Sequence, residues 1–262
     1  MSVITLTTDF GIEDAYVGVM KGVILGLNPQ ATIVDLCHHI EPQNVLQAGF
    51  LLHTSYRYFP PGTIHLVVID PGVGTGRKAI LVSAAGSFFL APDNGVLSYV
   101  MTENPAFQAC HLDNPEFWLP QVSATFHGRD IFAPVAAHLS LGVPPQKLGM
   151  SLASPLRRSL PLPRQEKGQL HGQVLHVDRF GNLITNIPAS QLPSKDVKVV
   201  IEGRSLELRE TYAQGEDLLA IIGSSGYVEV AQKDGHAARF LGVGMGCPVQ
   251  VITGEEAENV TA

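Results

Sequence analysis

The sequence of 262 residues contains few charged residues, few cysteines and no long apolar run. Charged residues make up only 16% of the chain, and the three cysteines, Cys37, Cys110 and Cys247, are scattered along it. An odd and scattered set of cysteines does not indicate a disulfide framework. No apolar run reaches the roughly 20 residues of a membrane-spanning helix, and the apolar start is too short and too close to acidic residues for a signal peptide. We therefore expect a cytoplasmic protein with no membrane partner.

The chain also lacks an excess of basic residues. Its formal net charge is −7 and its pI is about 5.8, which argues against nucleic acid or an anionic membrane as the main partner. This balance suits a cationic small molecule without demonstrating one. Hydrophobic residues make up 45% of the chain, enough for one large domain or two smaller ones with packed cores.

The first part of the chain alternates strand and helix signals. Apolar and β-branched runs predict strands at residues 3–7, 32–36 and 63–69. Apolar residues at helical spacing predict helices at residues 15–27, 44–59 and 130–141. The segment SAAGSFFLAPDNG predicts a hairpin. Such alternation predicts an α/β domain over residues 1–153, with a mainly parallel sheet covered by helices.

Residues 154–167 differ from the rest because proline and charged residues dominate there without an apolar period. This composition predicts a linker. Beyond it, short runs between frequent turns predict strands at residues 173–177, 183–187, 197–201, 218–222, 227–231 and 249–252. Strands at this spacing predict a second domain over residues 168–262, built as a small antiparallel barrel or sandwich.

The segment VVIDPGVGTGR combines an apolar run, Asp70, alternate glycines and Arg77. A phosphate-binding P-loop has the spacing G-x-x-x-x-G-K-[ST], and a dinucleotide-binding turn has G-x-G-x-x-G at the start of a helix. Here the glycines occur at every second residue, and the following residues 78–83 predict a strand. An acidic residue at the strand end would also repel a phosphate. The loop therefore needs a different explanation.

Carboxylates end two of the predicted strands, Asp9 in LTTDFG and Asp70 in VVIDPG. Ligands of open α/β sheets bind beyond the carboxyl ends of the strands, so these residues, with Asp14 nearby, are candidates for a ligand site. Each also has an ordinary structural role, since Asp9 can cap the following helix and Asp70 can begin a turn with Pro71. The pattern leaves both roles open.

The histidines of TFHGRDIF and CHHIEP are candidates for catalysis or metal binding. His127 precedes a predicted helix, where a histidine is more often a packed or capping residue, and Arg129 and Asp130 fit an exposed helix start. His38 and His39 are adjacent on a strand and point to opposite faces, so they do not share a metal. We expect no metal site.

Polar residues in the second part of the chain lie at predicted turns. HVDRFGNLITNI contains Asp178 and Asn182 around a Phe-Gly turn, and GSSGYVEVA contains Ser224 and Glu229. Polar residues at hairpin turns are common for structural reasons, and the pattern alone favours that interpretation.

Six segments, taken in order, resemble the S-adenosylmethionine hydrolase family, also called the hydroxide adenosyltransferases, which is related to the adenosyl fluoride and chloride synthases. They are TDFGIEDAYVG, VVIDPGVGTGR, FFLAPDNG, FHGRDIFAPVAAHL, DRFGNLITNI and SSGYVEVA. They extend over nearly the whole chain and are far more specific together than singly. The resemblance implies an α/β amino-terminal domain, a β-barrel carboxyl-terminal domain and a homotrimer with active sites between subunits.

The resemblance also implies an activity, the conversion of S-adenosylmethionine and water to adenosine and methionine, with no cofactor. The family's water-activating residues match Asp70, Arg77 and His127. Its adenosine contacts match Asp9 at the ribose hydroxyls, Asp70 close to the adenosine, and Asn182, Tyr212 and the Ala237 backbone at the adenine. Its contacts to the methionine end match Asp14, Asp178, Ser224 and Glu229.

Two positions depart from the family pattern. Gly223 stands where relatives often have asparagine, and Ser225 stands where halide-using relatives have arginine, which leaves the contact to the methionine carboxylate open. Halide-using relatives lack the Asp-Arg-His set and carry a longer insertion in the first domain, for which SAAGSF is too short. The resemblance therefore favours hydrolysis. A non-catalytic adenosine or S-adenosylmethionine sensor and a halide-using synthase stay open as alternatives. Family members act on the (R) sulfonium epimer, a preference that this sequence does not show.

Overall fold

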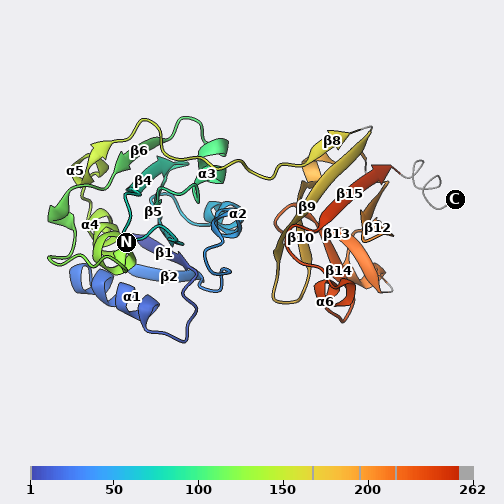
Figure 1. Ribbon diagram of the computed structural model, residues 1–262, viewed down its shortest axis with the longest axis horizontal. Coiled ribbons are helices and arrows are strands. Elements are labelled where there is room, and N and C mark those ends of the chain that lie inside the picture. The colour runs from blue at the N-terminus through green and yellow to red at the C-terminus, as the bar shows by residue number, and fades with distance from the viewer. Residues whose placement is uncertain (1, 167, 195, 216, 254–262) are drawn as a thin grey trace. The chain divides into compact units, whose positions relative to one another are not determined.

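The computed structural model describes residues 2–166, 168–194, 196–215 and 217–253, which belong to two compact units (Figure 1). The first unit spans Met1–Leu160 and the second spans Pro161–Ala262. Their boundary falls within the proline-rich segment 154–167. Each unit has its own sheet and its own hydrophobic core.

The first unit is built on a seven-stranded sheet in the order β2-β1-β3-β5-β4-β6-β7. The strands are β1 (Val3–Thr8), β2 (Thr32–Cys37), β3 (Ile64–Val68), β4 (Ala79–Ala84), β5 (Ser87–Pro92), β6 (Gln108–His111) and β7 (Met150–Ser151). β1 pairs in parallel with β2 and β3, and β3 pairs in parallel with β5. The other three pairings are antiparallel, including the predicted β4–β5 hairpin. The α/β prediction is confirmed, and the parallel half of the sheet carries Asp9 and Asp70.

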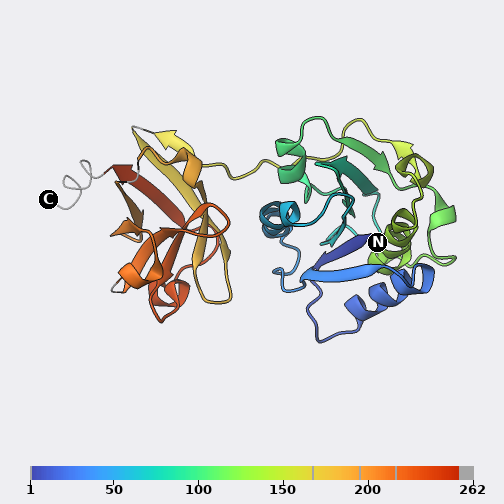
Figure 2. The ribbon, with the colours of Figure 1, turned by 180° about the vertical axis from the view of Figure 1, so that it is seen from behind.

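Helices cover both faces of this sheet (Figures 1 and 2). They are α1 (Tyr16–Leu27), α2 (Val45–Ser55), α3 (Ser98–Glu103), α4 (Ala133–Ser140) and α5 (Pro145–Leu148). Leu66 and Val68 pack into the cluster with α1 and α4, whereas Val67 and Ile69 pack into the cluster with α2 and α3. Burial of β3 on both faces explains its continuous apolar run.

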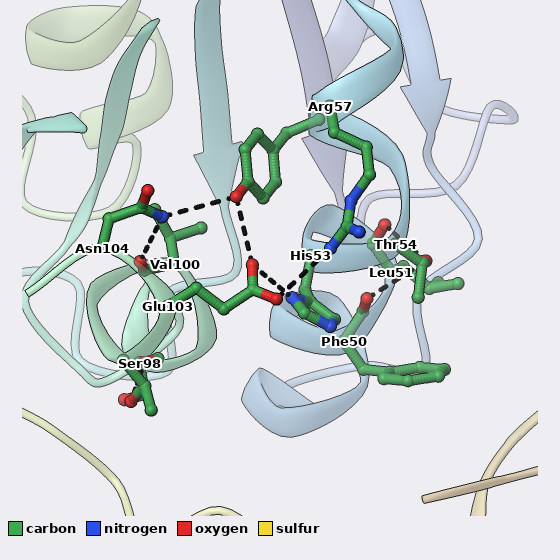
Figure 3. Close-up of polar contacts among 11 residues, drawn as sticks. Phe50, Leu51, His53, Thr54, Arg57, Ser98, Val100, Glu103 and Asn104 are labelled. Atoms are coloured by element: carbon green, nitrogen blue, oxygen red, sulfur yellow. Dashed lines mark hydrogen bonds and ion pairs between the residues drawn. The ribbon is translucent and has the colours of Figure 1, made fainter. Parts of the chain in front are cut away.

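A polar network joins α2 to α3 (Figure 3). Glu103 accepts hydrogen bonds from the Tyr56 hydroxyl at 3.1 Å and from Nη2 of Arg57 at 3.3 Å, and its carboxylate lies 3.2 Å from Nδ1 of His53. Burial lowers the pKa of His53, and the charge of Glu103 opposes that shift. These contacts hold α3 against the end of α2 and involve none of the predicted site residues.

The second unit is a closed seven-stranded β-barrel with one additional strand. The strands are β8 (Arg164–Glu166), β9 (Gln169–Val177), β10 (Leu183–Pro188), β11 (Val197–Ile201), β12 (Arg204–Arg209), β13 (Leu218–Ile222), β14 (Tyr227–Gln232) and β15 (Pro248–Thr253). They follow the order β10-β14-β13-β12-β11-β15-β9-β8, and a pairing of β9 with β10 closes the barrel. Apolar side chains such as Val174, Leu183, Val228 and Val230 fill its core.

The barrel prediction is confirmed, with four differences in detail, one of which is the unpredicted strand β12. β12 and β13 pair in parallel, whereas the other barrel pairings are antiparallel. β8 lies within the segment that we predicted to be a linker, and it pairs with β9. The short helix α6 (Ala237–Leu241) packs against the barrel core. β8 and β12 escape the sequence pattern because most of their residues are polar and exposed.

His65 is a fully buried histidine near the start of β3. Its ring stacks on Phe89 with a centroid distance of 5.0 Å, and its Nδ1 lies 2.8 Å from the hydroxyl of Thr5. In the part of the chain that the structure describes, its Nε2 has no hydrogen-bond partner. Burial lowers the pKa of His65 to about 4, because the charged ring would lose its hydration.

We expect the first unit to lose stability as the pH falls from about 6.5 to about 4. Between these pH values His65 binds a proton in the unfolded state but not in the folded state. Lowering the pH through this range therefore favours unfolding. The loss should approach 1.4 kcal/mol per pH unit, on the order of 3 kcal/mol in total.

Urea unfolding followed by the fluorescence of Trp118, the single tryptophan of the chain, reports on this unit. His65→Gln should reduce the slope of stability against pH by about one proton, whereas the exposed His39→Gln should leave it unchanged. Equal slopes in the wild type and His65→Gln would contradict the assignment.

Candidate active site

Arg77 joins Asp70 to His127 at the carboxyl end of β3. Its Nε donates to Oδ1 and Oδ2 of Asp70 at 2.9 and 3.0 Å, and its Nη2 donates to Oδ2 as well. Nη2 also lies 2.7 Å from Nδ1 of His127. The side chains of Arg77 and Asp70 are only 10% and 6% exposed. The structure therefore brings together all three residues that the sequence analysis predicted as catalytic.

Two glycines of the loop allow this arrangement. Gly74 has a φ of +76° and lies so close to the segment before His127 that a Cβ atom would overlap the carbonyl oxygen of Ala124. A Cβ atom on Gly72 would lie 3.2 Å from Cγ of Arg77. Small residues with free backbone angles are needed at such close approaches. The alternate glycines thus fold the loop back on itself, so that Arg77 reaches Asp70.

His127 is held at the start of a π-helical turn, Gly128–Phe132. Asp130 in this turn is fully buried and accepts hydrogen bonds from the backbone and hydroxyl of Ser123 at 2.8 and 2.7 Å. It also accepts a hydrogen bond from Nε of Arg129 at 2.5 Å. The prediction that Asp130 belongs to an exposed helix start was wrong, because its carboxylate ties down the loop before His127.

The environment of His127 favours the neutral imidazole. Burial lowers its pKa, the charge of Arg77 lowers it further, and Asp70 and Asp130 oppose the shift. A guanidinium can only donate, so the neutral ring must accept at Nδ1 and carry its proton on Nε2. His127 can therefore present an N–H group from Nε2 while Arg77 occupies its other nitrogen.

A cavity of about 540 Å³ opens beside these residues. Its lining includes Asp9, Asp70, His127, Phe10, Tyr16 and Phe126. The three aromatic rings pack edge to face or tilted, with centroid distances of 5.3–5.8 Å. Sequence reasoning missed these rings, although Phe10 and Phe126 each lie next to a predicted polar residue. A cavity with an apolar wall and converging carboxylates suits a small polar ligand with a flat apolar part.

Asp9 and Asp14 differ in position. Asp9 lines the cavity, and its Oδ2 accepts a hydrogen bond from the backbone N–H of Gln43 at 2.8 Å, which fixes the carboxylate. Asp14 is exposed and does not line this cavity, so its role stays a prediction.

Three residues predicted to bind substrate lie on or against the turn between β9 and β10, namely Asp178, Asn182 and Ala237. Oδ1 of Asp178 accepts from the backbone N–H groups of Phe180 and Asn182 at 2.9 and 2.8 Å, and Oδ2 accepts from the Asn182 amide at 2.9 Å. Gly181, with a φ of +88°, packs directly against His236, and its carbonyl accepts from Ala238 at 3.0 Å. These contacts hold α6, which contains the buried Ala237, against the turn.

Glu229 and Tyr212 share the electrostatic environment of Asp178. Glu229 on β14 is 6% exposed, and burial together with the charge of Asp178 raises its pKa to about 7. Burial and the charges of Glu229 and Asp178 raise the pKa of Tyr212. Ser224 lies exposed in the turn between β13 and β14. The second unit therefore presents a group of acidic side chains with an aromatic residue beside them.

A larger cavity, of about 840 Å³, lies along β4, β6 and β7. It contains none of the predicted site residues, and its one cysteine, Cys110, has a pKa raised to about 11 by burial. Among the described residues that line this larger cavity, we therefore find no group of reactive side chains.

The described residues contain neither a cluster of metal ligands nor a membrane-spanning helix. No group of three or more histidine, cysteine, aspartate or glutamate side chains among them could hold a metal ion. Among the same residues there is also no helix long and apolar enough to cross a membrane.

Comparison with known proteins relates the whole chain to one family. The family model for the SAM hydroxide adenosyltransferase N-terminal domain matches residues 4–149, and the model for the C-terminal domain matches residues 172–250. A protein from Thermus thermophilus named (R)-S-adenosyl-L-methionine hydrolase is 38% identical, covering 94% of this chain and 97% of its own length. A protein of the same name from Salinispora tropica is 37% identical, covering 96% of this chain and 98% of its own.

A more distant relative and a solved structure point to the same family. A fluorinase from Nocardia brasiliensis is 28% identical, with 96% of this chain and 97% of the relative covered. The crystal structure of a conserved protein from Thermotoga maritima matches with a TM-score of 0.89 at 38% identity, covering 95% of this chain and 99% of that one. With both halves matched by family models and with relatives above one-third identity along nearly their full length, the chain belongs to the SAM hydroxide adenosyltransferase family.

Proposed function

We propose that this protein hydrolyses S-adenosyl-L-methionine to adenosine and L-methionine, acting on the (R) sulfonium epimer without a metal or cofactor. The contact of Arg77 with both Asp70 and His127, at the edge of a cavity, is the observation that carries the proposal. The similarity to relatives named (R)-S-adenosyl-L-methionine hydrolase supports the substrate and the epimer.

The reaction is a displacement at the 5′ carbon of the substrate. The oxygen of a water molecule bonds to that carbon as the carbon–sulfur bond breaks, and the bonding electron pair passes to sulfur. Because the sulfonium leaves as a neutral thioether, no general acid is needed. The enzyme must hold one water in line with the breaking bond and remove its proton.

The three residues fit these two tasks. The guanidinium of Arg77 stabilises the negative charge that develops on the water oxygen. Nε2–H of His127 and the carboxylate of Asp70 orient the water, and Asp70 accepts its proton before releasing it to solvent. The buried position of Arg77 and Asp70 strengthens these interactions, since few water molecules screen them.

The remaining residues bind the substrate in this proposal. Asp9 accepts hydrogen bonds from the ribose hydroxyls, and the rings of Phe10, Tyr16 and Phe126 form the apolar wall. The adenine contacts Asn182, Tyr212 and the backbone of Ala237. The methionine end contacts Asp14, Asp178, Ser224 and Glu229.

Two other functions remain as alternatives. A sensor would bind S-adenosylmethionine and return it unchanged, and a halide-using synthase would form 5′-fluoro- or 5′-chloro-adenosine. The hydrolase is favoured over the synthase because the Asp70–Arg77–His127 set is present and the β4–β5 hairpin has only Ala85 and Gly86 between its strands. Chromatography of the products from each sulfonium epimer, with and without halide, separates the three functions.

We also propose that the enzyme is a cytoplasmic homotrimer. In this arrangement the first unit of one subunit and the second unit of its neighbour complete each active site. The division of the candidate residues supports the idea, because the water-activating residues belong to the first unit and Asp178, Asn182 and Glu229 belong to the second.

Asp70→Asn, Arg77→Ala and His127→Ala should each lower kcat about 10²–10³-fold and change the affinity for adenosine much less. These groups act on charge that exists mainly in the transition state, so their removal affects the chemical step. Steady-state kinetics and calorimetric binding of adenosine measure the two effects. Full activity of His127→Ala would remove His127 from the mechanism.

Asp9→Ala should weaken the binding of adenosine but not that of 2′,3′-dideoxyadenosine. A carboxylate accepts hydrogen bonds from both ribose hydroxyls, and the analogue has neither hydroxyl to lose. Isothermal calorimetry with the two ligands makes the comparison. An equal loss of affinity for both would show that Asp9 acts through the Gln43 loop and not on the ribose.

A mixture of the inactive variants Asp70→Ala and Asn182→Ala should recover activity if each site is shared between subunits. Random 1:1 refolding into closed head-to-tail trimers pairs an intact first unit with an intact second unit in about one quarter of the sites. Adenosine release after joint unfolding and refolding gives the recovered fraction. With mixed oligomers verified by size, activity no higher than that of the separate variants would place each site within one chain.

A further inference from the structure

Two buried histidines contact threonine hydroxyls at two places along β1. Nδ1 of His65 lies 2.8 Å from the hydroxyl of Thr5. Nδ1 of His38 lies 2.9 Å from the hydroxyl of Thr8, which is the last residue of β1. His38 directly follows β2, and β1 and β2 pair in parallel (Figure 1). Thr8 and His38 therefore lie at the carboxyl edge of the sheet, beside Asp9.

His38 links Thr8 to a carboxylate on β2. Its Nε2 lies 2.9 Å from Oδ1 of Asp35, and Nζ of Lys21 donates to Oδ2 of Asp35 at 2.6 Å. Burial opposes the ionisation of Asp35, but the hydrogen bonds from His38 and Lys21 outweigh it and lower the pKa of Asp35. A carboxylate can only accept, so Nε2 of His38 donates to Asp35. In the neutral ring Nδ1 then accepts a hydrogen bond from the hydroxyl of Thr8.

This chain of hydrogen bonds ends on the turn formed by residues 9–11. The hydroxyl oxygen of Thr8 accepts a hydrogen bond from the backbone N–H of Phe10 at 3.3 Å. The backbone carbonyl of His38 accepts one from the N–H of Gly11 at 2.8 Å. Gly11 has a φ of +67°, a conformation that favours glycine. One histidine thus holds two successive peptide groups of the turn, one through Thr8 and one directly.

Residues 9–11 carry two groups that line the cavity of about 540 Å³, the Asp9 carboxylate and the Phe10 ring. Oδ2 of Asp9 is held by the N–H of Gln43 at 2.8 Å, and the Phe10 ring packs on Tyr16 and Phe126. The contacts of His38 add a restraint on the backbone that joins these two groups. The pair made by Thr5 and His65 is different, because neither of its residues lines the cavity.

We propose that His38 is a positioning residue for nucleoside binding, which holds residues 9–11 so that the Asp9 carboxylate and the Phe10 ring meet the nucleoside together. This rests on the proposed function, which supplies the adenosine part of the substrate as the occupant of the cavity. His38 acts through Thr8 and through its own carbonyl, without touching the substrate. A turn that is fixed before the ligand arrives loses less conformational entropy on binding, so the ligand binds more tightly.

Thr8→Val tests the link through the side chains. Valine has nearly the shape of threonine but no hydroxyl, so the variant loses the contacts to His38 and to the N–H of Phe10. We expect KM for S-adenosylmethionine and Kd for adenosine to rise about tenfold, while kcat stays nearly unchanged because the water-activating residues are untouched. Thr8→Ser keeps the hydroxyl and should retain most of the affinity. Wild-type KM and Kd in Thr8→Val would overturn the proposal.

Thr5→Val is the matched control. It removes a hydroxyl from the same strand that is also buried and also lies beside Nδ1 of a histidine. Its partner, His65, lies near the start of β3 and not at the carboxyl edge of the sheet. We expect a similar fall in the melting temperature in both valine variants, but normal KM and Kd in Thr5→Val. An equal rise of KM in the two variants would show a general effect of a lost buried hydroxyl and would overturn the proposal.

Two substitutions test the histidine itself. In His38→Asn the amide oxygen can take the place of Nδ1 and accept from the hydroxyl of Thr8, whereas His38→Leu offers no acceptor. We expect KM to rise about tenfold in His38→Leu and clearly less in His38→Asn, with kcat nearly unchanged in both. A wild-type KM in His38→Leu would contradict the role of the histidine.

A double-mutant cycle shows whether Thr8 acts through the turn. Asp9→Ala removes one of the two groups that the turn presents, so its effect on Kd for adenosine should be less than additive with that of Thr8→Val. Full additivity would contradict the proposal. Calorimetric binding of adenosine does not depend on turnover. If these effects on binding occur without hydrolysis, the activity fails and the positioning role stands; if hydrolysis occurs and Thr8→Val binds and reacts as the wild type does, the positioning role fails.

Discussion

The guanidinium of Arg77 is the group on which the site in the first unit depends. It holds a carboxylate on one side and an imidazole on the other, and few water molecules reach it. Because a guanidinium cannot accept a hydrogen bond, its contact with Nδ1 also determines the tautomer of His127. One side chain thus holds Asp70 in place, determines the tautomer of His127 and brings a positive charge to this edge of the sheet.

The two units carry candidate residues of opposite charge. The first unit holds the buried cation Arg77 beside Asp70 and His127, and the second gathers Asp178, Glu229 and Tyr212, where the charge of Asp178 helps to raise the pKa of Glu229. In the proposed function, a cationic substrate suits this acidic group. A phosphate ligand, which the glycine-rich loop first suggested, is negatively charged and would be repelled by this acidic group.

Much of the fold follows from local patterns, whereas the fine geometry of the site does not. The buried run of β3 and the helical spacing of α1 and α2 are visible in the sequence, and Asp9 and Asp70 are marked by their positions at strand ends. The burial of Asp130 and the parallel pairing of β12 with β13 depend on contacts between distant segments. The sequence around Asp130 shows only an acidic residue at a helix start, and it does not show that the side chain is fully buried.

Two glycines show how backbone proximity shapes this chemistry. At Gly74 the missing side chain lets one loop meet the carbonyl of Ala124, and Arg77 then reaches both of its partners. At Gly223 the missing side chain leaves room for a carboxyl group from the neighbouring strand. Neither glycine carries charge, yet each decides where a charged group lies. A side chain added at either position would therefore move a charged group without changing any charge.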